Sequence, residues 1–227
     1  MTPEQKTKVG TPVVPRSKVD PTRSAKQVTA MYRDIEERYL GIKRALKALF
    51  DQRLTGRDRE VNRHNWHFLC HDHGEDMRLY QVNAGKFIYD MSAQELADLL
   101  EAVQGILDDY LLEGGEQNLW AMDYVVAEAQ RGTLEAFNNL SQQSQVYASQ
   151  TTLQQLLSSP GHLNQVAAAR LTTFSDWKVI SDTARGDLTN IITDAVARGV
   201  NPRETASVIS KRLDVSMSKA KTIAQTE

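Results

Sequence analysis

Apolar residues recur at helical spacing near the beginning of the chain. Between residues 26 and 50 they step mostly by three or four positions, which places them on one stripe along several helical turns. Thr22 precedes this run at a position suited to an N-cap. The pattern predicts a long amphipathic helix whose apolar stripe consists of Val28, Met31, Ile35, Tyr39, Ile42, Leu46, Leu49 and Phe50.

A second helical pattern begins at Ser92. Ser92 and Glu95 have the three-residue spacing of a capping box. Leucines and other apolar residues follow at helical spacing as far as Leu111, and Gly114 with Gly115 is expected to end the helix. Further helices are predicted at about residues 119–137, 164–174, 176–198, 202–213 and 216–226.

Strand patterns are convincing only in residues 79–91. Two runs of β-prone side chains flank the sequence Asn-Ala-Gly at residues 83–85, which predicts a small hairpin. Residues 53–65 are charged and have no apolar period, so a loop or linker is expected there. Four of the six prolines fall in residues 1–21, and proline both lacks an amide donor and fixes φ. That segment is therefore predicted to be an extended arm.

These patterns predict a mainly α protein, with a multi-helix body, one small β-hairpin and an extended N-terminal arm. Charge is segregated along it: residues 1–66 carry 15 basic and 8 acidic side chains, residues 67–158 carry 3 and 14, and residues 159–227 carry 9 and 7. We therefore expect an arm at 1–21, a basic helix and linker at 22–66, an acidic helical region with the hairpin at 67–158, and a C-terminal helical module at 159–227.

Composition excludes several classes of protein. The chain has 227 residues and a formal net charge of −2, and 41% of its residues are hydrophobic, which is typical of a globular protein rather than a disordered one. No run approaches the roughly 20 apolar residues of a membrane helix. The first residues lack the apolar core of a secretory signal. The single cysteine, Cys70, allows no intramolecular disulfide, so we expect a soluble protein made in a reducing compartment.

One long segment carries no charge. Between Glu135 and Arg170 there is no Asp, Glu, Lys or Arg side chain, whereas glutamine and serine are abundant. Such a surface is expected either against a neighbouring subunit, where amides form hydrogen bonds without the desolvation cost of charges, or as a low-complexity helical surface. The sequence leaves both interpretations open.

The densest cluster of metal-ligating residue types lies at residues 66–76. It contains His67, His71 and His73 beside Cys70 and three carboxylates. A zinc helix of the H-E-x-x-H type needs a glutamate directly after its first histidine, but Phe68 stands there. An incidental polar loop and a metal-dependent enzyme are therefore the competing interpretations, and the first is favoured. No metal ligand is predicted.

Other enzymatic motifs are absent. The sequence has no G-x-S-x-G turn, no P-loop and no G-x-G-x-x-G loop. We therefore predict no catalytic residue, no cofactor-binding residue and no enzymatic activity.

Candidate nucleic-acid contacts lie in two regions. The predicted helix at 26–50 has a basic face formed by Arg33, Arg38, Lys43, Arg44 and Lys47. Residues 201–226 have the spacing of a helix-turn-helix, with a turn at 214–216 and Ser216 as the second cap. The basic side chains expected to contact DNA in that module are Lys211, Arg212, Lys219 and Lys221. A helix-turn-helix DNA-binding protein is the alternative function.

The same C-terminal stretch carries a resemblance. Residues 199–202 read Gly-Val-Asn-Pro, residues 215–220 begin with Val-Ser, and residues 223–227 read Ile-Ala-Gln-Thr-Glu. These segments resemble the phage head-morphogenesis family, the Mu-type minor head proteins, whose closing pattern is R-A-x-x-I-A-R-T-E. Lys219 and Gln225 replace two of its arginines. Family members generally continue past this Thr-Glu pair, and the similarity covers roughly residues 75–227.

The resemblance implies a minor virion component that associates with the portal vertex, is made in the host cytoplasm, and acts in capsid assembly, DNA packaging or genome delivery. It implies no catalytic residue. The expected partners are a portal protein and packaged double-stranded DNA, with the chain forming an oligomer in the virion and avoiding membranes. The basic helix at 26–50 would contact DNA phosphates without sequence preference.

Overall fold

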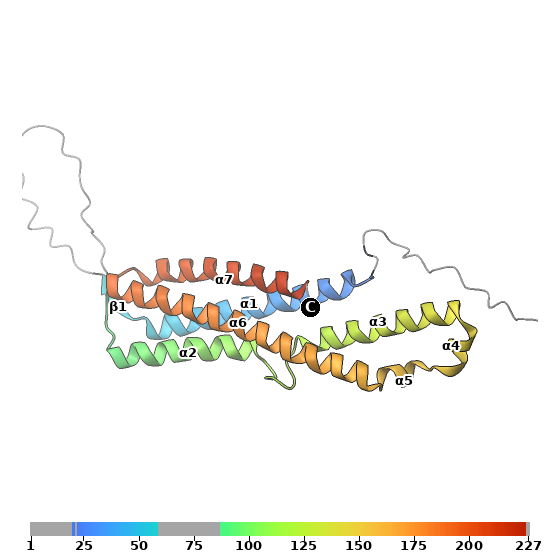
Figure 1. The fold of residues 1–227 in the computed structure, drawn as a ribbon. Helices are drawn as coiled ribbons and strands as arrows, with labels where there is room; N and C mark the ends of the chain where they lie inside the picture. Colours follow the sequence, from blue (N-terminus) through green and yellow to red (C-terminus); the bar gives the residue numbers. More distant parts are fainter. Residues whose placement is uncertain (1–19, 21, 59–86, 226–227) are drawn as a thin grey trace, which may run out of the picture. The chain divides into compact units, whose positions relative to one another are not determined.

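The protein is mainly helical, as predicted. The computed structural model describes residues 20, 22–58 and 87–225, in which seven helices and one two-stranded antiparallel sheet are found (Figure 1). The elements are α1 (Ala25–Arg53), β1 (Gly56–Asp58), β2 (Phe87–Tyr89), α2 (Ala93–Leu111), α3 (Met122–Gln143), α4 (Gln145–Gln150), α5 (Leu153–Leu157), α6 (Pro160–Arg198) and α7 (Pro202–Ala224). Only Asp20 of the predicted arm at 1–21 is described. The rest of the arm lies outside the described residues.

The chain forms two compact units. In the first unit, Leu111–Ser181 packs with the chain before Tyr39 and with the chain from Met217 onward. The second unit combines Tyr39–Tyr110 with Asp182–Ser216. Helices α1, α6 and α7 therefore each contribute to both units. The bounds of the units do not coincide with the segments predicted from charge, 22–66, 67–158 and 159–227. No described helix is both long and apolar enough to cross a membrane.

The predicted stripe of α1 is its buried face. Met31 and Ile35 are buried in the first unit, and Tyr39, Ile42, Leu46 and Phe50 in the second. Helix α2 buries a leucine or valine at every fourth position, and α6 and α7 supply the remaining buried residues of the second core. The buried residues from α2 are Leu99, Val103 and Leu107, and those from α6 and α7 are Ala184, Leu188, Ile192, Ala195, Thr205, Ile209 and Leu213.

The first core is centred on two indoles. Trp120, which precedes α3, packs edge-on against Trp177 of α6 with ring centroids 4.6 Å apart. Trp120 Nε1 donates to the Leu111 carbonyl at 3.1 Å, and the Arg38 guanidinium lies 4.1 Å from the centre of the Trp120 ring. Trp177 is fully buried, and no described group accepts a hydrogen bond from its Nε1. Ring packing therefore holds this core more than hydrogen bonding does.

The sheet corrects part of the sequence prediction. Its second strand, β2, falls in the predicted β-prone run, but its described partner is β1, with Gly56 opposite Tyr89 and Asp58 opposite Phe87. Residues 56–58 were expected in a loop, because three residues without an apolar period give no strand signal. Gly56 is required there, since a Cβ atom would lie 2.2 Å from the Ile88 carbonyl oxygen. The first predicted run, 79–82, lies outside the described residues.

The predicted starts of two helices have different outcomes. The capping box of α2 is confirmed: the Ser92 amide donates to Glu95 Oε2 at 2.7 Å and the Glu95 amide to Ser92 Oγ at 3.2 Å. Thr22 was the wrong choice of cap for α1. The Asp20 carboxylate accepts from the Ser24 and Ala25 amides at 3.1 and 3.3 Å, and Thr22 bonds to the Ser24 hydroxyl instead.

Two predicted helix breaks are absent. Helix α6 runs through residue 175, and α7 runs through the turn expected at 214–216. Residues 214–216 contain neither glycine nor proline, and their side chains are used within the second unit. Asp214 pairs with Lys43 at 2.6 Å, and Ser216 Oγ lies 2.8 Å from the Tyr39 hydroxyl. The two-helix geometry of a helix-turn-helix is therefore not present in α7.

Candidate functional site

A helical hairpin in the first unit is the most unusual element of the structure. We define it as residues 123–172, from the start of α3 to the first third of α6. Figure 1 shows α3 leading to α4 and the chain returning through α5 and α6. Thr133 Oγ1 lies 3.4 Å from His162 Nδ1, and the rings of Phe137 and Tyr147 are 6.1 Å apart. The first contact joins α3 to the returning helix α6, and the second joins α3 to α4.

Local caps explain the bend of the chain at the far end of the hairpin. Ser144 ends α3 and accepts a hydrogen bond from the Tyr147 amide at 3.2 Å, which starts α4. Thr152 and Gln155 form a reciprocal capping box at the start of α5. Pro160 is the first residue of α6, where its missing amide hydrogen costs nothing. The short helices α4 and α5 thus follow from the sequence of their caps.

No residue of the hairpin is buried. Buried side chains end at Met122 and begin again at Thr173, with 50 residues between them. Large apolar side chains are instead exposed, and the exposed fractions of Leu163 and Leu171 reach 55% and 60%. Leu134, Leu140 and Val146 are also exposed. A single helix-to-helix contact leaves the outer surfaces of both helices in water, so the hairpin has no core of its own.

Charge is confined to the base of the hairpin. Arg131 forms ion pairs with Glu128 and with Glu135, the latter at 3.2 Å, and also donates to the Thr22 carbonyl. The hydrogen bonds that Arg131 donates to the Glu128 carboxylate are the main reason why the pKa of Arg131 is raised. Beyond Glu135 the hairpin is uncharged until Arg170, so the segment singled out in the sequence is its outer part.

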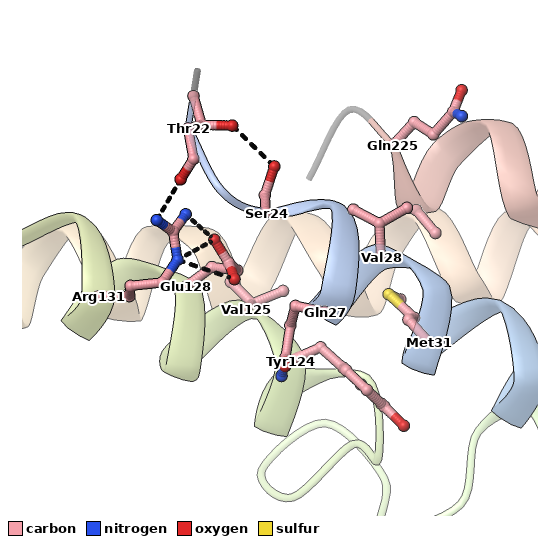
Figure 2. A pocket seen from close by; sticks show the side chains of 11 residues that line it. Thr22, Ser24, Gln27, Val28, Met31, Tyr124, Val125, Glu128, Arg131 and Gln225 are labelled. Atoms are coloured by element: carbon pink, nitrogen blue, oxygen red, sulfur yellow. Dashed lines mark hydrogen bonds and ion pairs between the residues drawn. The ribbon is translucent and has the colours of Figure 1, made fainter. Parts of the chain in front are cut away.

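A cavity of about 310 Å³ lies beside this base, between α1, α3 and the end of α7 (Figure 2). Val28, Met31 and Val125 form its apolar lining, and Glu128 with Arg131 forms a charged wall. Because Arg131 is saturated by its carboxylates and by Thr22, the wall offers no free charge to a ligand. The cavity contains no nucleophile with an adjacent base, which catalysis of group transfer would need.

Four of the nine predicted nucleic-acid contacts are used inside the fold. Arg38 pairs with Asp34 and with Glu113, at 3.1 and 2.7 Å, while it covers the Trp120 ring. Three further basic residues bind carboxylates. These pairs are Lys43 with Asp214, Arg212 with Asp187, and Lys221 with Glu36. Their charges are at least partly neutralised, because each already has an acidic partner.

The other five predicted contacts point to solvent. Arg33, Arg44, Lys47, Lys211 and Lys219 are exposed, and no described carboxylate forms an ion pair with any of them. Three of the five, Arg44, Lys47 and Lys211, belong to the second unit, whereas Arg33 and Lys219 belong to the first. The nine residues therefore do not form one site within one unit.

No metal site is found in the part of the chain that the structure describes: no group of three histidine, cysteine, aspartate or glutamate side chains is suitably placed. The cluster at 66–76 lies outside those residues, so the metal-site alternative stays a hypothesis.

Comparison with known proteins adds no relative to this picture. No family model, curated protein or solved structure matches the chain. The segments that carry the resemblance to head-morphogenesis proteins lie in and around α7. Gly199 has a positive φ of 66°, and the Asn201 side chain caps α7 by accepting from the Arg203 amide at 3.0 Å. The helix start predicted at residue 202 is thereby confirmed.

The candidate functional site is therefore the surface of the hairpin. Its uncharged stretch is visible in the sequence, but its hairpin geometry is not, because the pairing of α3 with α6 is a tertiary property. An exposed, uncharged surface with leucines and amides is suited to binding another protein.

Proposed function

We propose that this chain is a phage minor head protein that associates with the portal vertex and acts in capsid assembly, DNA packaging or genome delivery, without enzymatic activity. The proposed association with the virion and its portal rests on the resemblance at residues 199–227. The observation that carries the proposal is the hairpin, since 50 consecutive residues without a buried side chain are characteristic of an element that another protein covers.

The chemistry of the hairpin favours a protein partner over the other classes. A nucleic-acid surface needs cations for the phosphates, and residues 136–169 contain none. A membrane surface needs a continuous apolar face with basic residues beside it, whereas here glutamine, serine and asparagine alternate with the leucines. Amides and isolated leucines are suited to the rim and core of a protein interface.

The test of this function is co-purification with a portal protein of the phage, followed by measurement of the mass of the complex. The expected result is a complex with a defined number of chains per portal ring. Deleting residues 1–19, which keeps the Asp20 cap of α1, should weaken the association and leave the helical content unchanged, because the proline-bearing arm is expected to order on the portal. A chain that never co-purifies with the portal protein contradicts the proposal.

Contact with packaged DNA is a separate part of the same proposal. Arg44, Lys47 and Lys211 are exposed in the second unit without a described ion-pair partner, so they are available to phosphates. Changing all three to glutamine should weaken binding to duplex DNA of any sequence. Because each phosphate contact contributes about 0.9 to the slope of log affinity against log salt, the slope should fall by about 2–3.

The matched control for DNA binding replaces two cations that the fold already uses. Lys43→Gln and Arg212→Gln remove ion pairs with Asp214 and Asp187, and they should change DNA affinity much less than the triple variant. Fluorescence anisotropy over a series of salt concentrations measures both sets. Equal affinity of the triple variant and the native chain would remove these residues from the DNA surface.

A further inference from the structure

The two helices of the hairpin share one exposed face. A cavity of about 270 Å³ on this face is lined by Ala127 and Gln130 from α3 and by Arg170 from α6. Side chains from both helices therefore open onto the same side of the hairpin near its base. Helical periodicity extends this face outward from the cavity.

Each helix continues the face with apolar residues. On α3, Ala127, Gln130 and Leu134 are spaced i, i+3, i+7 and are all exposed. On α6, Leu163 and Ala167 precede Arg170 at the spacing i, i+4, i+7, and both are exposed. Two helices with apolar stripes side by side form half of a four-helix bundle, the arrangement in which such stripes are normally buried.

We propose that this face binds the same face of a second copy of the chain, so that two hairpins form an intermolecular four-helix bundle. The inference deepens the proposed function, because it names a partner for the hairpin on which that function rests. Charge argues for this occupant. A two-fold axis brings equivalent surfaces together, and any charge near it meets a like charge. Only Arg170, at the base of the hairpin, is charged among the face residues, which are Ala127, Gln130, Leu134, Leu163, Ala167 and Arg170. Residues 136–169 carry no charge either, so little repulsion opposes the pairing.

The available area agrees with a dimer. Helix α3 has 22 residues and is about 33 Å long at 1.5 Å per residue. Residues 160–172 of α6 are about 20 Å long, so the two helices, each about 10 Å across, give a footprint of about 530 Å² on each copy. The total of about 1,050 Å² just exceeds the roughly 1,000 Å² expected of a biological interface. A dimer of moderate affinity is therefore expected, held by leucines and by amides at the centre.

Introducing negative charge on the face tests the pairing. In the full chain, Leu134→Glu with Leu163→Glu places two carboxylates on the face of each copy. The control, Ala136→Glu with Gln165→Glu, places the same charges on the same helices, but each two residues further along and thus about 200° around the helix. All four positions are exposed. Sedimentation measures the mass of each variant over a range of concentrations, and circular dichroism measures its helicity.

The native chain and the control should be dimers, and the face variant should be a monomer of native helicity, with dimerisation weakened by about a hundredfold or more. Leu163→Gln alone is a second, uncharged variant in case the double substitution lowers helicity, and it should weaken the dimer in the same direction. A native chain that is monomeric at every concentration overturns the pairing. So does a control that dissociates as readily as the face variant.

The portal experiment separates this inference from the proposed function. If the native chain is monomeric and still co-purifies with the portal protein, the pairing is wrong and the proposed function stands. If the native chain is a dimer, the face variant is a monomer, and the native chain never binds the portal protein, the pairing stands and the proposed function is wrong.

Discussion

The two parts of α6 behave differently although they belong to one continuous helix of 39 residues. Residues 160–172 contain no buried side chain. Residues 173–198 bury one at nearly every turn, beginning with Thr173 and Trp177 and ending with Ala195. The first part contacts α3 through His162, whereas the second part contributes to the cores of both units.

The difference shows that helical structure and burial have separate causes in this chain. The first part of α6 contains alanine, leucine and glutamine, which favour helix without any tertiary contact. The second part contains a β-branched or aromatic residue at half of its eight buried positions, and these side chains are stabilised chiefly by packing. The outer hairpin is thus a helix that another surface can cover, and the remainder of α6 is already covered.

The largest effect should come from emptying the covered part. Trp177 is fully buried against Trp120, and Trp177→Ala should lower the free energy of unfolding by about 3–5 kcal/mol, through lost burial and the cavity left behind. Leu171→Ala, six residues earlier on the same helix, should cost about 0.5 kcal/mol or less because Leu171 is 60% exposed. Urea denaturation followed by circular dichroism measures both, and similar losses would contradict the comparison.

The covered parts were the more predictable ones. The stripe of α1 and the leucines of α2 were read correctly from spacing, because a helix that buries one face leaves a period of three to four residues in the sequence. The predicted fold class followed from these stripes. Helix breaks were less predictable. The turn expected at 214–216 is helical, since Asp214 and Ser216 find partners on α1, and such partners are not visible from local sequence.

The candidate site was predictable only in composition. The absence of charge between Glu135 and Arg170 is visible in the sequence, but the shared face of Gln130 and Arg170 depends on how two distant helices pack. The sequence is equally limited in showing which basic side chains are exposed. Arg33 and Arg38 look equivalent in the sequence, yet Arg38 covers Trp120 and Arg33 is exposed. Spacing identifies the face of a helix, whereas partners across the fold decide which charge is available.

An effect of intermediate size is expected at alkaline pH, which should lower the stability of the covered core. Burial raises the pKa of Tyr39 to about 12, from about 10, with the hydrogen bond to Ser216 opposing the shift. Folding therefore favours the neutral phenol. Its contribution to stability is complete below pH 10 and is lost as the pH rises to about 12, a loss of about 2–3 kcal/mol.

Tyr39→Phe provides the control for this pH dependence. The variant should be about 1 kcal/mol less stable at neutral pH, because the hydrogen bond to Ser216 is lost. Between pH 10 and 12 its stability should fall by less than that of the native chain. Denaturant midpoints measured across this pH range give both values, and identical slopes in the two proteins would show that Tyr39 does not carry the dependence.

The smallest effect should come from loosening the helix in its uncovered part. Ala168 is exposed in the first part of α6, and Ala168→Gly should cost up to about 1 kcal/mol of helix propensity with no packing lost. Because the hairpin has no core, this cost should be local: amides of residues 160–172 should exchange with solvent about fivefold faster, and the global unfolding midpoint should barely move.

Ala184→Gly is the matched change in the covered part, where Ala184 is only 3% exposed. It removes the same methyl group and the same propensity, but the methyl is packed, so the cost should appear in the global midpoint rather than in local exchange. Hydrogen exchange with mass spectrometry and thermal denaturation separate the two outcomes. If Ala168→Gly lowered the global midpoint as much as Ala184→Gly, the hairpin would unfold together with the cores. The hairpin and its exposed face would then belong to the same cooperative unit as the cores, and the hairpin would not be a separate element that a partner stabilises.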